Sequence, residues 1–332
     1  MIVTGSTYPA DTTTEIIDVI DGETCAELAD FPREIAYSVG ADLQGTPVVC
    51  GGFFESPPHE SSNKCYQFIE NAWQEFATMN KARTFAAGTI YDKKFHIFGG
   101  NDGSAKKSTE IVSTCGVVID GPVLPTGVSD NTITSINATV SILSGGYQYD
   151  ANNDISYSLD QTWYYNHATQ EFKSGPTLLE RRHLHASATI IDKITKSNIP
   201  VVSGGITMAG NSGNSYVMLD STELLIHGEW QAGKLLINIY CWFCLPRNHH
   251  SYLFFLLLML GPPLPKKLTR HKMLEIQGDL FVFGGMSDDG RQAAIHKLEC
   301  SSNNCSWSTI NQQMHTAKRD VVAIAVPNWF CK

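Results

Sequence analysis

The sequence has 332 residues, which is enough for two domains or for one large all-β domain. It is 42% hydrophobic and 17% charged, so it can bury a sizeable core, and it lacks the long Ala/Leu/Glu/Lys periodicity that is typical of helices. The formal net charge of -9, without any Lys/Arg-rich stripe, argues against nucleic acid as a partner.

Short apolar runs that end in a glycine pair recur along the chain. The pairs begin at Gly51, Gly99, Gly145, Gly204 and Gly284, and "MIVTGS" at Gly5 is a weaker copy. The first three intervals between copies are similar in length, the fourth is somewhat longer, and the last, from Gly204 to Gly284, is the longest. A period of about 50 residues with strands throughout predicts the blades of a β-propeller.

Each copy carries the same companions in the same order. An arginine precedes the first strand of five units, at Arg33, Arg83, Arg182, Arg270 and Arg319. A strand with Thr-Glu follows the glycines in "TTTEIIDV", "KSTEIVST" and "DSTELLIH". An aromatic residue then opens a fourth strand, at Trp73, Phe172, Trp230 and Trp307. Four strands in each unit predict one blade per unit.

These residues resemble the kelch repeat family over nearly the whole chain. The family's repeat has Gly-Gly after the second strand, an aromatic residue in the third and a tryptophan in the fourth. This chain departs from it in three units: Ser6 follows Gly5, the fourth unit lacks the arginine, and the third lacks the tryptophan. The resemblance implies an all-β, six-bladed kelch propeller with four antiparallel strands in each blade.

The two ends of the chain are expected to share one blade. The sequence begins inside a second strand, "IVTG", and finishes with an orphan first strand, "DVVAIAV". We therefore expect residues 1–332 to form a single propeller whose ring is closed by the C-terminal strand, which removes free sheet edges. An open array of sheets is the alternative.

The long interval from Gly204 to Gly284 indicates an insertion in the fifth unit. Deleting residues 233–260 aligns "WQAGPPLP" with "FKSGPTLL" and brings that interval close to the length of the others. We interpret the segment as a retained intron, because Gly-Lys codons can contain a splice donor and Phe/Leu codons suit the pyrimidine tract before an acceptor. The rival interpretation is a genuine hydrophobic loop for membrane or partner contact. Its longest apolar run, 252–260, is too short to span a bilayer.

The nine cysteines suggest two local disulfides. Cys50 ends a second strand and Cys65 lies in the neighbouring third strand, so the two can reach disulfide distance. Cys300 and Cys305 flank "SSNN", where a bridge would close a hairpin. Cys25, Cys115 and Cys331 have no assigned partner, and Cys241 and Cys244 lie in the inserted segment. The alternative is that all of the cysteines outside that segment are reduced thiols.

The expected compartment follows from these cysteines and from one sequon. Two local bridges favour an oxidising environment, and "NAT" at Asn137 is an N-glycosylation sequon on an expected loop. We therefore expect an extracellular glycoprotein. No basic and then apolar leader precedes the first strand, so a cytoplasmic location is the alternative.

No catalytic residue, metal site or cofactor is expected from the sequence. His183 and His185 alternate along one strand, and Ser144 and Ser203 lack a G-x-S-x-G context. Phosphate-loop, Rossmann and paired metal motifs are missing. The copper radical oxidases related to galactose oxidase do use a kelch propeller for catalysis, and Cys65 beside Tyr66 is the feature that keeps this remote alternative open.

The resemblance implies that the loops joining second to third strands and fourth to first strands share one face that holds partners. Arg33, Arg83, Arg182, Arg270 and Arg319 are candidates for a cationic ring on that face, which would bind a carboxylate-bearing peptide. Each arginine could instead hydrogen-bond the turn of its own blade. We expect a monomeric scaffold for a protein or peptide ligand, without a membrane span. The alternative is the substrate-recognition propeller of an intracellular ubiquitin-ligase adaptor without its helical domains.

Overall fold

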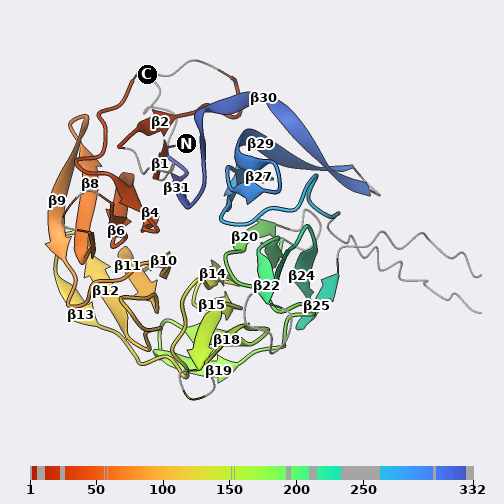
Figure 1. The fold of residues 1–332 in the computed structure, drawn as a ribbon, viewed down its shortest axis with the longest axis horizontal. Coiled ribbons are helices and arrows are strands. Elements are labelled where there is room, and N and C mark those ends of the chain that lie inside the picture. The colour runs from red at the N-terminus through yellow and green to blue at the C-terminus, as the bar shows by residue number, and fades with distance from the viewer. Residues whose placement is uncertain are drawn as a thin grey trace, which may run out of the picture.

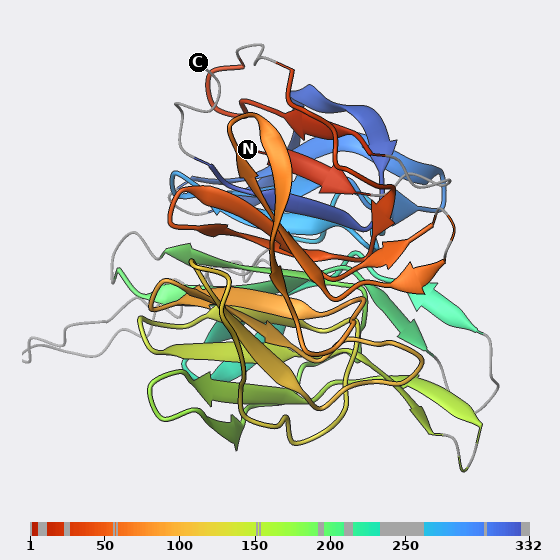
Figure 2. The ribbon, with the colours of Figure 1, turned by 90° about the vertical axis from the view of Figure 1, so that its left-hand side faces the viewer.

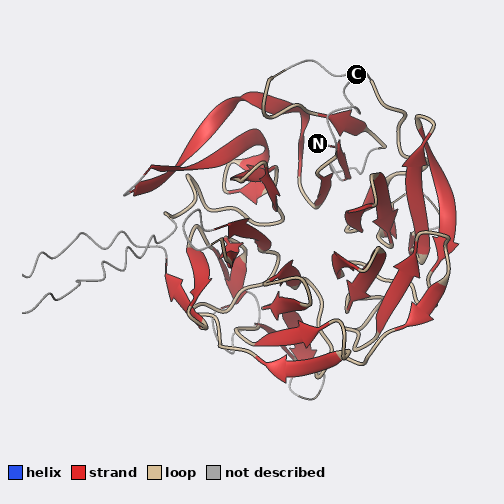
Figure 3. Ribbon diagram, turned by 180° about the vertical axis from the view of Figure 1, so that it is seen from behind, coloured by secondary structure: helices blue, strands red, loops and turns tan. Residues whose placement is uncertain are grey.

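The computed structural model describes residues 2–5, 12–22, 27–55, 57, 59–150, 152, 154–191, 196–208, 215–232, 262–301 and 304–326. These residues form strands and loops only (Figure 3). None of them forms a helix of the length and apolar character needed to cross a membrane. The expected insertion at 233–260 lies outside the described residues.

Most strands belong to six antiparallel sheets, here numbered I to VI. Sheet I contains β31 (Val321–Ile324), β1 (Ile2–Gly5) and β2 (Thr14–Ile16). Sheet II contains β4 (Val39–Leu43), β5 (Thr46–Cys50), β8 (Lys64–Ile69) and β9 (Ala72–Thr78). Sheet III contains β10 (Ala87–Tyr91), β11 (Lys94–Phe98), β12 (Thr109–Ser113) and β13 (Val118–Asp120).

The remaining three sheets repeat this strand order. Sheet IV contains β14 (Thr132–Ser135), β15 (Val140–Ser144), β18 (Thr162–Asn166) and β19 (Glu171–Ser174). Sheet V contains β20 (Ala186–Ile191), β21 (Asn198–Ser203), β24 (Thr222–Ile226) and β25 (Glu229–Ala232). Sheet VI contains β26 (Lys272–Ile276), β27 (Asp279–Phe283), β29 (Gly290–Ser301) and β30 (Asn304–Lys318).

Short strands also form in the connections between second and third strands. They are β6 (Phe53–Phe54), β7 (Glu60–Ser61), β16 (Tyr147–Asp150), β17 (Ile155–Ser158), β22 (Ile206–Met208), β23 (Tyr216–Met218) and β28 (Met286–Ser287). One more, β3 (Ile35–Ala36), precedes the first strand of sheet II and pairs with β6. Sheet I has three strands among the described residues. A fourth strand is expected near residues 23–26, which the structure does not describe.

The six sheets surround a central axis (Figure 1). Their innermost strands contact one another in the order β4, β10, β14, β20, β26, β31 and again β4. Strand β31 pairs with β1 in an antiparallel register that places Ile324 opposite Ile2, so the two ends of the described chain share sheet I. In the side view the strands run between two faces at which the loops gather (Figure 2).

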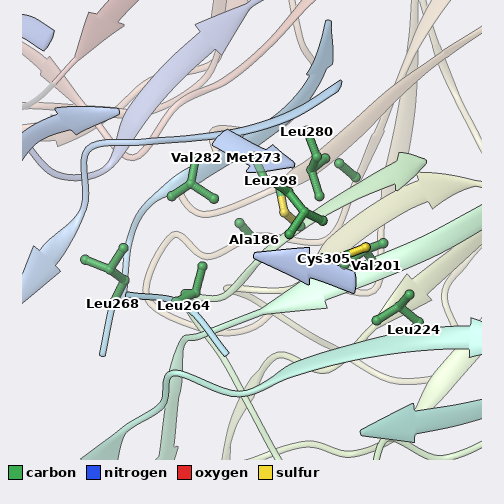
Figure 4. Close-up of a cluster of buried hydrophobic side chains, with 11 residues drawn as sticks. Ala186, Val201, Leu224, Leu264, Leu268, Met273, Leu280, Val282, Leu298 and Cys305 are labelled. Atoms are coloured by element: carbon green, nitrogen blue, oxygen red, sulfur yellow. The ribbon is translucent and has the colours of Figure 1, made fainter. Parts of the chain in front are cut away.

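The core consists of apolar clusters between neighbouring sheets rather than one central cluster. Sheets V and VI, for example, bury Ala186, Leu224, Met273 and Leu298 against each other (Figure 4). Comparable clusters fill each of the other five gaps, including the gap between sheets VI and I. Because side chains alternate across a strand, an innermost strand such as β31 contributes to the clusters on both of its sides.

The glycine pairs are required by the close approach of successive sheets. Gly51 and Gly52 have φ angles of 67° and 98°, in the left-handed region. A Cβ atom on Gly51 would lie 2.4 Å from the carbonyl oxygen of Arg83, at the start of the next sheet. The pair therefore marks the point at which one sheet contacts the entry to the next, which explains why it recurs in five of the six units.

Candidate functional site

The loops that the sequence placed on one face do meet there. In four sheets the segment entering the first strand forms a single bridge with the loop between the second and third strands of the same sheet, at Thr84 with Asn101, Ser129 with Tyr147, His183 with Ile206 and Thr269 with Met286. In sheet II the pairing of β3 with β6 takes its place. We call this side of the molecule the loop face. The hairpin turns between first and second strands lie at the opposite ends of these strands.

Six residues with an unusual backbone conformation surround the axis at the loop face. Each lies just before the innermost strand of its sheet and has a positive φ of 53–60°, and they are Tyr37, Phe85, Asp130, Leu184, Arg270 and Asp320. Left-handed backbone is disfavoured for side chains of this kind by about 1–2 kcal/mol. We call these six residues the axial ring.

Backbone hydrogen bonds connect the axial ring from sheet to sheet. After Tyr37, the amide of each residue donates to the carbonyl oxygen of the preceding one, from Phe85 to Tyr37 (2.9 Å), Asp130 to Phe85 (3.0 Å), Leu184 to Asp130 (3.1 Å), Arg270 to Leu184 (2.8 Å) and Asp320 to Arg270 (3.0 Å). These bonds compensate for the strained backbone. The ring therefore holds six side chains at fixed places around the axis.

The side chains of the axial ring form an aromatic and charged cluster. The rings of Tyr37 and Phe85 stack at 4.2 Å between centroids. The Arg270 guanidinium lies 5.7 Å from the Tyr37 centroid and 5.9 Å from that of Phe85. Its Nη1 donates to both carboxylate oxygens of Asp320 at 3.0 Å. Since Phe85 and Arg270 are three places apart in the ring, their side chains together span it.

Two carboxyl groups in the axial ring have raised pKa values. Burial raises the pKa of Asp130 to about 7, although the Ser129 hydroxyl hydrogen-bonds to it at 2.7 Å and the positive charge of Arg270 opposes the shift. Burial also raises the pKa of Asp320, against the opposing effect of Arg270. The charge state of the ring therefore changes near neutral pH.

The structure divides the five candidate arginines among different positions. Arg83 and Arg182 are fully buried, with 0% exposed side chains. Arg83 donates to the carbonyl of Gly99 at 2.6 Å, and Arg182 donates to that of Gly204 at 2.7 Å. Each thus hydrogen-bonds the glycine turn of its own sheet, which was the second of the two interpretations.

The two buried arginines also pair with the glutamates of the Thr-Glu strands. Arg83 Nη2 lies 2.5 Å from Glu110, and Arg182 Nη2 lies 2.6 Å from Glu223. Each carboxylate also accepts two backbone N–H groups from the loop that enters its sheet. Buried charges persist when they are paired and hydrogen-bonded in this way. The pair therefore fastens the incoming loop to its sheet.

A lysine takes the place of the arginine in sheet I. The buried Lys318 Nζ lies 3.6 Å from Glu15, whose other oxygen accepts the His315 amide at 2.7 Å. The equivalent positions in the intervening sheets, two residues before the axial ring, are the buried apolar residues Ile35, Val128 and Leu268. Buried ion pairs thus occur in sheets I, III and V and alternate with apolar contacts in sheets II, IV and VI.

The other three arginines do not share one position. Arg33 has a one-third exposed side chain and lies over the Phe54 ring at 3.8 Å. Arg270 belongs to the axial ring, and Arg319 precedes Asp320 with its Nε 3.5 Å from that carboxylate. Relative to the axial ring, the five arginines occupy four different places, so they do not form one cationic ring.

The comparison with solved structures supplies the fold type. The structure of YjhT matches with a TM-score of 0.68 and 11% sequence identity, over 87% of this chain and 89% of that chain. The fold is of the β-propeller type. Neither a family model nor a curated protein matches the sequence. At this identity the likeness concerns the fold alone, so membership of the kelch family stays a prediction.

The propeller contains the disulfide expected between Cys50 and Cys65, which lie directly opposite each other on β5 and β8. Cys305 is also disulfide-bonded and faces Cys300 across the β29–β30 hairpin, although the side chain of Cys300 lies outside the described part. Cys115 is an exposed free thiol whose pKa is lowered by the Ser113 hydroxyl. Cys25, Cys241, Cys244 and Cys331 fall outside the described residues.

The expected glycosylation site lies away from the loop face. Asn137 is exposed in the turn between β14 and β15, at the opposite face of the propeller. Its side-chain oxygen accepts the backbone amides of Thr139 and Val140, both at 2.9 Å. A glycan on Asn137 would therefore leave the axial ring accessible.

The histidines and serines weighed as catalytic candidates have structural partners. His183 and His185 hydrogen-bond the hydroxyls of Ser158 (2.8 Å) and Thr132 (3.0 Å), and burial lowers the pKa of both imidazoles. The two remaining candidates, Ser144 and Ser203, are fully buried. The sulfur of Cys65 is bonded to Cys50, so it is not available for a link to Tyr66. Within the described part, no three His, Cys, Asp or Glu side chains gather as a metal-ligand set.

The axial ring is the functional candidate that sequence reasoning missed. Its members share a backbone conformation rather than a residue type, so a search for repeated side chains does not find them. They could have been found only by their position: when the units are aligned on Arg83 and Arg182, each member of the axial ring lies two residues after the aligned position.

Proposed function

We propose that the chain is a six-bladed kelch propeller closed by β31, and that it serves as a non-enzymatic scaffold that binds a protein or peptide ligand on its loop face. The circular order of contacts between the innermost strands supports the six blades. The pairing of β31 with β1 and the apolar cluster between sheets VI and I support the closure. Both ends of the chain then stabilise the same blade.

The observation that carries the binding role is the axial ring. It gathers stacked aromatic rings, a guanidinium and two carboxylates at the point where the loops of all six sheets converge. Aromatic residues and arginine are the side chains that contribute most to protein recognition. The surrounding loops, 53–63, 101–107, 206–220 and 286–292, differ in length and chemistry, as expected where a rigid scaffold presents recognition elements.

We further propose that the protein is extracellular, monomeric and glycosylated at Asn137. The Cys50–Cys65 disulfide supports this location because structural disulfides persist in oxidising compartments. The exposed position of the sequon supports the glycan. A cytoplasmic protein would be expected to contain both cysteines as free thiols.

Selection of peptides from a random display library on the immobilised protein tests the binding role. Enriched peptides should lose binding to a Phe85→Asn variant, because asparagine keeps the left-handed backbone and removes the aromatic ring. They should retain binding to Glu70→Gln, a change in the β8–β9 turn on the opposite face. Peptides that bind both variants as well as the unmodified protein would refute the assignment of the loop face.

A further inference from the structure

Asp130 is the carboxylate of the axial ring that has no cation beside it. The structure shows Ser129 donating to one oxygen of Asp130 at 2.7 Å. Among the described residues, no Lys, Arg or His nitrogen lies within 4.0 Å of the carboxylate. Asp130 as a whole is half-buried, although its carboxyl group is buried enough to raise its pKa. A partly desolvated carboxylate of this kind is stabilised by a cation from outside.

The other charges near the axis are already balanced. Arg270 and Arg319 both lie within 3.5 Å of Asp320. Glu55 is near enough to raise the pKa of Asp320 further, after burial and against the two arginines. Two positive groups therefore accompany two negative groups around Asp320, and Asp130 adds a third carboxylate on which Arg270 acts only at longer range.

The neighbouring aromatic rings already accept a cation. Phe85 precedes Asp130 in the axial ring and stacks on Tyr37. The guanidinium of Arg270 lies within 6 Å of both ring centroids, the range in which a cation is attracted to an aromatic face. A second cation that approaches Asp130 would meet Phe85 next to it and could use the same attraction.

We propose that the axial ring binds a basic side chain, a lysine or an arginine, of the protein or peptide ligand, with Asp130 as its counter-ion and Phe85 as its apolar contact. This inference rests on the proposed binding role of the loop face and names the class of ligand. The formal net charge of -9 favours it, because a negative protein attracts basic partners over distance.

Four capped tripeptides test the proposal: acetyl-Gly-X-Gly-amide with X as lysine, arginine, glutamine or glutamate, titrated against the full chain and followed by NMR of the peptide. The lysine or arginine peptide should bind most tightly. Asp130→Asn should weaken that binding at least tenfold, because it removes the charge and retains a residue that tolerates left-handed backbone. Glu70→Gln, which removes an exposed carboxylate from the opposite face, should change it less than twofold.

The pH profile of the unmodified protein is a second readout that needs no variant. With the pKa of Asp130 at about 7, binding should weaken about tenfold for each pH unit below that value as the carboxylate is protonated. Ser129, Arg270 and Asp320 are the groups that influence this titration. Because basic side chains keep their charge across this range, the slope belongs to the protein.

Three results would overturn the basic ligand: tighter binding of the glutamate peptide, undiminished binding to Asp130→Asn, or no binding of either basic peptide up to about 20 mM with a flat pH profile. The display selection separates this failure from that of the binding role. Enriched acidic peptides that depend on Phe85 would preserve the binding role and refute the basic ligand.

Discussion

Deleting residues 233–260 should leave the propeller folded and make it more stable. The two flanks of the segment occupy the same structural positions as their counterparts in sheets III and IV. The amide of Leu264 donates to the carbonyl of Asp220, as Leu124 does to Lys107 and Leu178 to Asp160.

The length of the connection that follows the fourth strand shows which residues of sheet V have no counterpart in sheet IV. In sheet IV, residues 175–177 separate the end of β19, at Ser174, from Leu178. In sheet V, residues 233–263 separate the end of β25, at Ala232, from Leu264. Removing residues 233–260 leaves 261–263 as the connection, which then has the same length as its counterpart in sheet IV.

The expected gain has two sources. Shortening the connection roughly tenfold lowers the entropic cost of closing it by about 2 kcal/mol, at roughly 0.6 kcal/mol for each halving. The second source is a lost hydrogen bond. The Thr162 hydroxyl donates to the Pro176 carbonyl at 2.7 Å, whereas the equivalent buried Thr222 hydroxyl has no partner among the described residues. Restoring this bond through Pro262 would add about 1 kcal/mol.

Urea unfolding of the full chain and of the deletion variant would measure the change, with about 3 kcal/mol as the upper estimate. A smaller deletion, of residues 240–253, serves as the control, because it shortens the segment without joining the aligned positions. Solubility should also be preserved or improved, because an apolar segment is removed. A deletion variant that fails to fold, or that unfolds at lower urea than the full chain, would refute the insertion and show that the segment contributes to the core.

Three further predictions concern stability. Lys318→Met should cost about 3–5 kcal/mol by leaving the buried Glu15 carboxylate without a counter-ion, and changing both residues to Met should recover part of that loss, as judged by urea unfolding. Changing Cys50 and Cys65 together to alanine should cost about 3 kcal/mol under oxidising conditions, and peptide mapping that finds both cysteines freely alkylated in the native protein would contradict the bridge. Burial lowers the pKa of His271 to about 3. As the pH falls below about 6.5, His271 is therefore protonated in the unfolded chain but stays neutral in the folded chain. This difference should lower the free energy of unfolding by about 1.4 kcal/mol for each pH unit below that value. Urea unfolding at several pH values measures the slope, and an equal slope in His271→Gln would show that His271 does not contribute.

The repeated sheets could be predicted from sequence because their cause acts on residue type. Gly51 recurs at an equivalent place in each unit since a Cβ atom there would collide with the next sheet. The Cys50–Cys65 disulfide followed from the same strand order. Where the backbone geometry tolerates only glycine, or where a disulfide requires cysteine, the residue type itself can be recognised in the sequence.

The candidate site could not be predicted in the same way. Aligning the units on arginine placed Arg270 and Arg83 in one class, although Arg270 belongs to the axial ring and Arg83 is buried two positions earlier in its unit. Lys318 escaped the alignment because it is a lysine that fills the position of Arg83. The positions of the axial ring are set by backbone hydrogen bonds, which place no requirement on the side chain.

This independence from side chains makes the axial ring suitable for protein engineering. The five bonds that connect its members join peptide groups only, from Tyr37 round to Asp320. Replacing any of the six side chains would leave those bonds in place, and asparagine or glycine would relieve the left-handed strain. A combinatorial library randomised at these six codons would present about 6 × 10⁷ different surfaces on one framework, since the number of variants grows twentyfold with each position that tolerates substitution.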